Sequence, residues 1–71
     1  MGWGSGADLM TDVIHVVNRN EQHELKRIAI YKGLIRAFQG HDWDTEMDCI
    51  GIDNAFDKAL KELEPAMFED E

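Results

Sequence analysis

The chain lacks most of the features that fasten small proteins together or attach them to membranes. Its 71 residues contain one cysteine, Cys49, which cannot form an internal disulfide and suits a reducing compartment. No apolar run approaches the roughly 20 residues that a membrane-spanning helix needs. The first nine residues are rich in glycine and lack the basic start and apolar core of a signal peptide. We therefore expect a cytoplasmic protein that has no membrane partner.

Length and composition predict one small folded domain. A chain of 71 residues suffices for one domain with a thin core. Apolar residues make up 44% of it, which is too many for a disordered chain. We expect a single helical domain over residues 1–71, with residues 1–5 as a flexible leader. Residues 66–71 form an acidic tail whose Met67 and Phe68 either fold back on the core or stay mobile. The thin core leaves a homodimer open beside a monomer.

A first helix is predicted after Ser5, which forms an acidic capping box with Asp8. Apolar residues then recur at helical spacing: Leu9, Met10, Val13, Ile14, Val16 and Val17. The β-branched content of this segment also allows a strand, but the capping signal and the spacing favour a helix. We expect the helix to break at "NRN", residues 18–20, and an asparagine of this stretch to cap the next helix.

The second helix is predicted by the clearest apolar repeat in the chain. The repeat consists of Leu25, Ile28, Tyr31, Leu34, Ile35 and Phe38. Gly40 stands where a left-handed C-terminal cap belongs. Gly33, inside the repeat, costs about 1 kcal/mol relative to alanine. It either marks the close approach of another helix or is merely tolerated.

A short helical turn and a third helix are predicted to follow. Thr45 and Asp48 form a second capping box, which predicts one turn of helix over residues 46–50. Asp53 then caps a helix that Pro65 stops. The expected buried face of that helix is Phe56, Ala59, Leu60 and Leu63. The predicted fold is all-α: an antiparallel helical hairpin plus a third helix, with the short turn between the second and third helices.

Charge is distributed unevenly along the chain. Residues 1–40 hold five basic and four acidic residues, whereas residues 41–71 hold two basic and eleven acidic residues. The acidic half attracts basic surfaces, including one that normally holds nucleic acid, and it repels nucleic-acid phosphates. It therefore opposes direct nucleic-acid binding by the basic residues Arg19, Lys26, Arg27, Lys32 and Arg36. The alternative is that the charge only keeps a small protein soluble.

The segment "HDWDTEMDCIGID", residues 41–53, is the candidate for a metal site. A calcium loop that started at Asp42 would have acids at coordinating positions, but Met47 replaces the glycine that makes the sharp turn. Zinc would find only His41 and Cys49 in this segment. Helix capping accounts for the charged residues without an ion, so we predict no metal and no cofactor. A calcium- or zinc-binding switch or structural protein that uses this segment is the alternative.

No residue pattern predicts catalysis, and the predicted function is partner binding. Nothing orders Cys49 with a histidine as a nucleophilic pair, and so short a chain offers little wall for a pocket, so we expect no enzyme. Trp3 and Trp43 lie just outside predicted helix starts, where they either cover the helix pair or stand exposed as anchors. The predicted partner-binding residues are Trp3, Asp42, Trp43, Asp44, Glu46, Asp48 and Phe68.

Four segments carry a family resemblance that covers nearly the whole chain. "MGWGSG", "AIYKGLIRAF", "HDWDT" and "FDKAL" resemble a group of small acidic proteins of tailed phages and prophages. The resemblance implies a phage accessory protein that acts in the bacterial cytoplasm, and it implies no catalytic or ligand-binding residue. Together with the charge, it predicts a non-enzymatic protein that binds and modulates a host or phage protein through its acidic surface. One version of this hypothesis is nucleic-acid mimicry, in which the carboxylates occupy a basic cleft.

Overall fold

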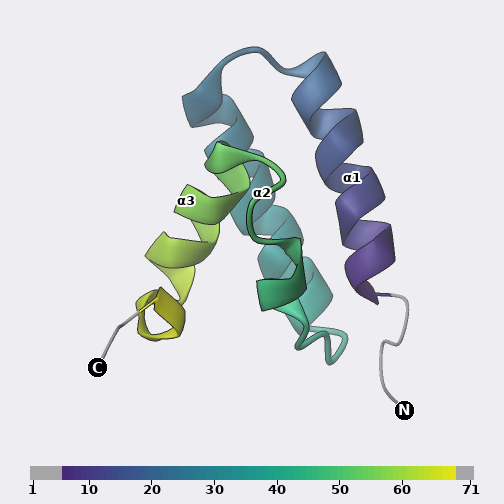
Figure 1. Cartoon of the computed structure of the whole chain (residues 1–71), viewed down its shortest axis with the longest axis vertical. Helices are drawn as coiled ribbons and strands as arrows, with labels where there is room; N and C mark the ends of the chain where they lie inside the picture. Colours follow the sequence, from purple (N-terminus) through teal and green to yellow (C-terminus); the bar gives the residue numbers. More distant parts are fainter. Residues whose placement is uncertain (1–5, 69–71) are drawn as a thin grey trace.

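The computed structural model describes residues 6–68, and in this range all regular structure is helical (Figure 1). The elements are α1 (Gly6–Asn20), α2 (Glu24–Gln39), the 3₁₀ helix η1 (Glu46–Cys49), α3 (Asn54–Leu63) and the 3₁₀ helix η2 (Pro65–Phe68). The predicted small three-helix domain is therefore confirmed. Ser5 and Trp3 lie outside the described residues, so the first capping box and the first tryptophan are not placed.

The helices α1 and α2 form an antiparallel hairpin, and the rest of the chain covers one side of it (Figure 1). The helix α3 packs on α2, whereas η1 contacts α1 through the Cys49 sulfur, which lies 3.9 Å from the Thr11 hydroxyl. The chain measures 34 × 30 × 19 Å, so it is a flat molecule. In the view down its shortest axis, η1 and α3 lie in front of α2 (Figure 1).

One apolar core joins the three helices. Its buried members are Met10, Ile14, Ile28, Tyr31, Ile35, Trp43, Cys49, Ala55, Phe56, Ala59 and Leu60. The rings of Tyr31 and Phe56 meet edge to face at 5.6 Å, which ties α2 to α3. Met67 and Phe68 pack against this core from η2. Of the two alternatives for the start of the tail, the structure therefore shows these two residues folded back.

The link between α1 and α2 differs from the prediction. The helix α1 continues through residues 18–20, and the Asn20 side-chain amide donates to the Val16 carbonyl at 2.8 Å inside the helix. His23 is the N-cap of α2 and its side chain makes no cap hydrogen bond. The backbone N–H of His23 instead donates to the Glu21 carboxylate at 3.1 Å. The predicted asparagine cap, by Asn18 or Asn20, is wrong because α1 is longer than its last apolar residue suggested.

The end of α2 also differs. Gly40 has φ −63° and ψ −15°, which is right-handed, and the positive φ of this loop falls on Asp42, at 71°. The predicted left-handed cap at Gly40 is therefore wrong. The last helical carbonyls are satisfied by successive turn amides, because Phe38 accepts from both His41 and Trp43. A Cβ added at Gly33 would meet nothing within 4 Å, so this glycine marks no close helix approach within residues 6–68.

The predicted short turn and third helix are present, with one cap confirmed and one absent. The Asp53 carboxylate accepts the Ala55 backbone N–H at 3.0 Å, as an N-cap should. Thr45 is the N-cap of η1, but its hydroxyl makes no cap hydrogen bond and is buried without a partner among residues 6–68. The chain enters α3 through Gly51, at φ 97°, whose N–H donates to Asp57 at 3.1 Å.

Candidate functional site

The segment of residues 41–53 has an inner part, whose side chains are buried, and an outer part, whose side chains are exposed. Asp53 is the inner residue with the most hydrogen-bond partners. The Asp53 side chain is buried between α1, α2 and α3. Its Oδ2 accepts a 2.6 Å hydrogen bond from the Tyr31 hydroxyl and a 3.1 Å bond from the Arg27 Nε. The same hydroxyl lies 3.2 Å from the Ile14 carbonyl oxygen, which brings α1 into the network.

This network holds Asp53 in its charged form. Burial raises the pKa of the Asp53 carboxyl, but hydrogen bonds from Tyr31, Asn18 and the Ala55 amide, with the charge of Arg27, outweigh burial and lower that pKa. Burial and the Asp53 carboxylate together raise the pKa of the Tyr31 hydroxyl. A carboxylate bonded in this way joins the helices that its partners belong to.

Two predicted partner-binding residues, Trp43 and Glu46, also belong to the inner part. Trp43 is 2% exposed and packs edge to face on Phe38 at 5.3 Å. Glu46 is 4% exposed, and its carboxylate accepts a 2.6 Å hydrogen bond from the Gln39 side-chain amide. Neither side chain is presented to a partner in this structure. Of the two alternatives for Trp43, the structure shows the buried one, in which the ring covers the helices, and not the exposed anchor.

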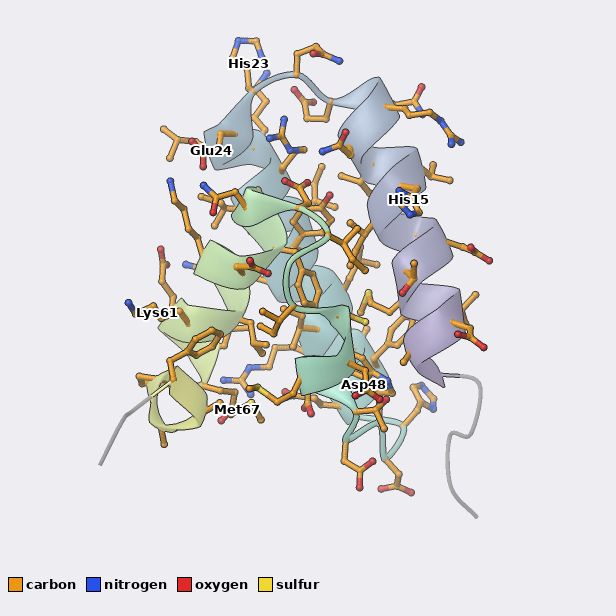
Figure 2. The ribbon with its side chains drawn as sticks, viewed as in Figure 1. His15, His23, Glu24, Asp48, Lys61 and Met67 are labelled. Carbon is orange, nitrogen blue, oxygen red and sulfur yellow. The ribbon has the colours of Figure 1, made fainter. Side chains whose placement is uncertain are left out.

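The outer part contains the remaining predicted acids. Asp42, Asp44 and Asp48 are exposed, and Asp48 lies near the lower end of the molecule (Figure 2). Phe68 is half-buried against the core, and Trp3 lies outside the described residues. Met47, which the sequence reasoning did not single out, is 51% exposed among these acids. Its signal in the sequence is its position between two acids in an otherwise polar turn.

The hairpin brings two further acids to the end of the molecule where Asp42, Asp44 and Asp48 lie. Because α1 and α2 are antiparallel, the start of α1 lies beside the loop that follows α2 (Figure 1). Asp8 and Asp12 of α1 are exposed there. Burial, with the charges of Asp48, Asp8 and Glu46, raises the pKa of the Cys49 thiol, which lies between η1 and α1. We call the exposed set, Asp8, Asp12, Asp42, Asp44 and Asp48, the acidic pole.

Basic residues do not neutralise the acidic pole, because the ion pairs of residues 6–68 lie elsewhere. Most of them join α2 to α3: Lys32 pairs with Glu62, Arg36 with Glu64 at 3.0 Å, Lys58 with Glu24 at 2.7 Å and Arg27 with Asp53 at 3.1 Å. The basic face of the second helix therefore meets the acids of its own chain. None of these ion pairs includes an acidic-pole residue.

The same range of residues contains no cluster that could hold a metal ion and no helix that could span a membrane. Among residues 6–68, no three histidine, cysteine, aspartate or glutamate side chains come together in a way that could hold a metal ion. None of the helices described has the length and apolar character needed to cross a bilayer. The Cys49 side chain is fully buried, with its sulfur 3.6 Å from the Ala7 carbonyl oxygen.

Comparison of the chain with protein-family models, with curated proteins and with solved structures gives no match.

Proposed function

We propose that this protein is a non-enzymatic accessory protein whose acidic pole binds a basic surface on a partner protein. The observation that carries the proposal is the separation of charge within the fold. Three of the cations of α2 pair with acids of α3, or at its cap, while the acidic pole keeps its five carboxylates exposed. An uncompensated field at one end steers a basic partner toward that end and speeds association.

The acidic pole also has an apolar contact to offer. Met47 is half exposed in η1, next to Asp48, and a flexible thioether adapts to irregular partner surfaces. Aspartate side chains lose little rotamer freedom when they are fixed, so rigid positioning on helix ends and a short loop favours binding. The proposed contact set is therefore the acidic pole with Met47. Phe68 lies on η2 and supports the core instead.

The proposed setting is a bacterial cell infected by, or carrying, a phage. The resemblance of the segments "MGWGSG" and "AIYKGLIRAF" to small acidic phage proteins supports this setting, and the burial of Cys49 as a thiol agrees with a reducing compartment. The partner is a host or phage protein. A basic cleft that normally holds nucleic acid is the surface whose chemistry matches several carboxylates grouped at one end.

Affinity capture with matched charge variants tests the proposal. The test variant is D42N/D44N/D48N, and the control is E24Q/E62Q/E64Q, whose acids pair with cations away from the acidic pole. Both variants remove three negative charges, so any nonspecific effect of net charge is the same. Wild type and control should recover the same bacterial protein at low salt, and the test variant should lose it.

Two results would count against the proposal. Equal loss of the partner from the test and control variants would show that net charge alone matters. Capture of no protein by the wild type, at low and at physiological salt, would remove the basis for partner binding. Nucleic-acid mimicry is then a separate question: double-stranded DNA added to the complex should release the captured protein if the same cleft is used, and should leave it bound otherwise.

A further inference from the structure

The side of the hairpin opposite to η1 and α3 carries exposed apolar residues from both helices. On α1 these are Leu9 and Val16, each 49% exposed, with the half-buried Val13 between them. At about 100° per residue, these three lie within about 60° of one another on the helix. Ala7 and Thr11, which contact Cys49 of η1, lie roughly 160–200° around the helix from Leu9. The α1 stripe therefore faces away from η1.

The helix α2 presents a matching stripe. Ile30 is 40% exposed, and Gly33 and Ala37 follow it on the same side of the helix. Lys32 and Arg36, which pair with Glu62 and Glu64, lie roughly 90–130° around the helix from the centre of this stripe. A Cβ built on Gly33 meets no atom within 4 Å, so this side of α2 is open within residues 6–68.

The two stripes look toward the same side of the molecule. Both η1 and α3 lie in front of α2 in the view down the shortest axis, so the stripes turned away from them share the far side (Figure 1). We call Leu9, Val13, Val16, Ile30, Gly33 and Ala37 the hairpin face. The molecule is 34 × 30 Å across this broad aspect, which can accommodate the about 800 Å² that each partner buries in a standard interface.

The charges that border the hairpin face decide what covers it. Lys26 continues the α2 stripe at the end near the α1–α2 link, while the acidic pole occupies the opposite end of the hairpin. On the outer flank of α1, Asp12 and Arg19 lie seven residues apart and thus in one row. One end of the hairpin face is therefore bordered by positive charge and the other end by negative charge, and the two ends attract each other.

We propose that the hairpin face binds the hairpin face of a second copy of this chain, with each helix antiparallel to its counterpart. The two-fold axis lies in the interface and perpendicular to the helices. This arrangement brings Lys26 to the carboxyl end of the partner's α2, and Arg19 beside the partner's Asp12. It also puts the remaining acids of the two acidic poles at opposite ends of the dimer. A two-fold axis along the helices would stack the poles and is opposed by their repulsion.

Sedimentation equilibrium over a range of protein concentrations tests the proposal. The wild type should reach twice the chain mass, and Ile30→Glu should weaken the dimer by at least about tenfold, because a charge would be buried in the interface. Leu25→Glu is the matched control: it makes the same chemical change on the same helix, at a side chain that is 81% exposed and off the hairpin face. It should leave the dimer unchanged. Far-UV circular dichroism checks that both variants remain helical.

A charge swap tests the orientation. Arg19→Asp and Asp12→Arg should each weaken the dimer, and the double variant should regain affinity, because only the antiparallel arrangement brings the two positions together. A wild type that stays monomeric up to millimolar concentration would overturn the proposal. So would an Ile30→Glu variant that dimerises as tightly as Leu25→Glu. A double variant no tighter than the single variants would overturn the proposed arrangement.

Discussion

At the scale of single residues, Asp53 contributes most because three elements depend on it. Its carboxylate caps α3 and accepts bonds from Tyr31 and Arg27 of α2, and the Tyr31 hydroxyl links it to the Ile14 carbonyl oxygen of α1. We predict that Asp53→Asn lowers the free energy of unfolding by about 3 kcal/mol at pH 7, since it leaves Arg27 without its carboxylate partner while keeping a capping side chain. Urea unfolding measures the loss. Asp48→Asn, at an exposed acid, is the control and should change stability by less than about 0.5 kcal/mol.

The lowered pKa of Asp53 gives this loss a pH dependence. A carboxyl whose pKa is lowered by folding adds stability that is present above its unfolded value and disappears as pH falls through its folded value. The ordinary value is 3.8. The stability difference between wild type and Asp53→Asn should therefore be constant near neutral pH and shrink below about pH 3.8. A difference that stays constant down to pH 2 would contradict the ionised network.

Tyr31 makes the opposite prediction at high pH. Burial and its bond to Asp53 raise the pKa of the hydroxyl above the ordinary value of 10.0. A raised pKa adds stability that is complete below pH 10 and is lost as pH rises through the folded value. We predict that Tyr31→Phe costs about 1–3 kcal/mol at pH 7, because Asp53 loses its shortest bond, and that it flattens the decline in Tm above pH 10. The pKa of the Cys49 thiol is raised too, so Cys49→Ala measures the share of this high-pH decline in Tm that comes from the thiol and not from Tyr31.

At the scale of elements, local signals predicted the helices but not all of their ends. Ile28, Tyr31 and Ile35 recur at helical spacing, and burial follows that spacing because one stripe must face the core. The cap at Asp53 was predictable because an aspartate before an apolar repeat bonds locally. Gly40 misled the prediction, since φ at a helix end depends on the turns that follow it.

Only the part of the candidate site whose residues are close in sequence was predictable. Asp42, Asp44 and Asp48 could be read as one group because they are neighbours in sequence. Trp43 and Glu46 are buried because they contact Phe38 and Gln39. Those contacts form only when the chain folds, so the sequence pattern did not predict them. Asp8 and Asp12 join the acidic pole through the hairpin, and no local pattern marks them.

Two glycines provide a matched test at the element scale. Gly33 is in the interior of α2 with open space where a Cβ would be, whereas Gly51 has φ 97°. We predict that Gly33→Ala raises the free energy of unfolding by about 0.5–1 kcal/mol, because alanine favours the helix. Gly51→Ala should lower it by about 1–2 kcal/mol, because an L residue is strained there. Thermal unfolding of dilute protein measures both, and equal signs for the two variants would contradict the backbone described.

At the scale of the whole molecule, two residues of the acidic pole are placed where they oppose stability. Asp42 and Asp44 follow the carboxyl end of α2, where the helix dipole disfavours negative charge, and they lie among like charges. The acids that pair with Lys32, Arg36 and Lys58 help α3 to pack on α2 instead. A feature that costs stability and contributes nothing to the core is typical of a binding surface, which supports the proposed function.

This asymmetry makes a prediction that depends on position and not on net charge. D42N/D44N/D48N and E24Q/E62Q/E64Q both change the formal net charge from −8 to −5. The first should raise Tm, since it relieves repulsion at the acidic pole, and the second should lower Tm slightly, since exposed ion pairs contribute about 0–1 kcal/mol each. Adding 0.5 M salt should raise the wild-type Tm and reduce the gap between the variants, because screening weakens both effects. Equal shifts of the two variants would show that total charge, and not its placement at one end of the hairpin, governs this fold.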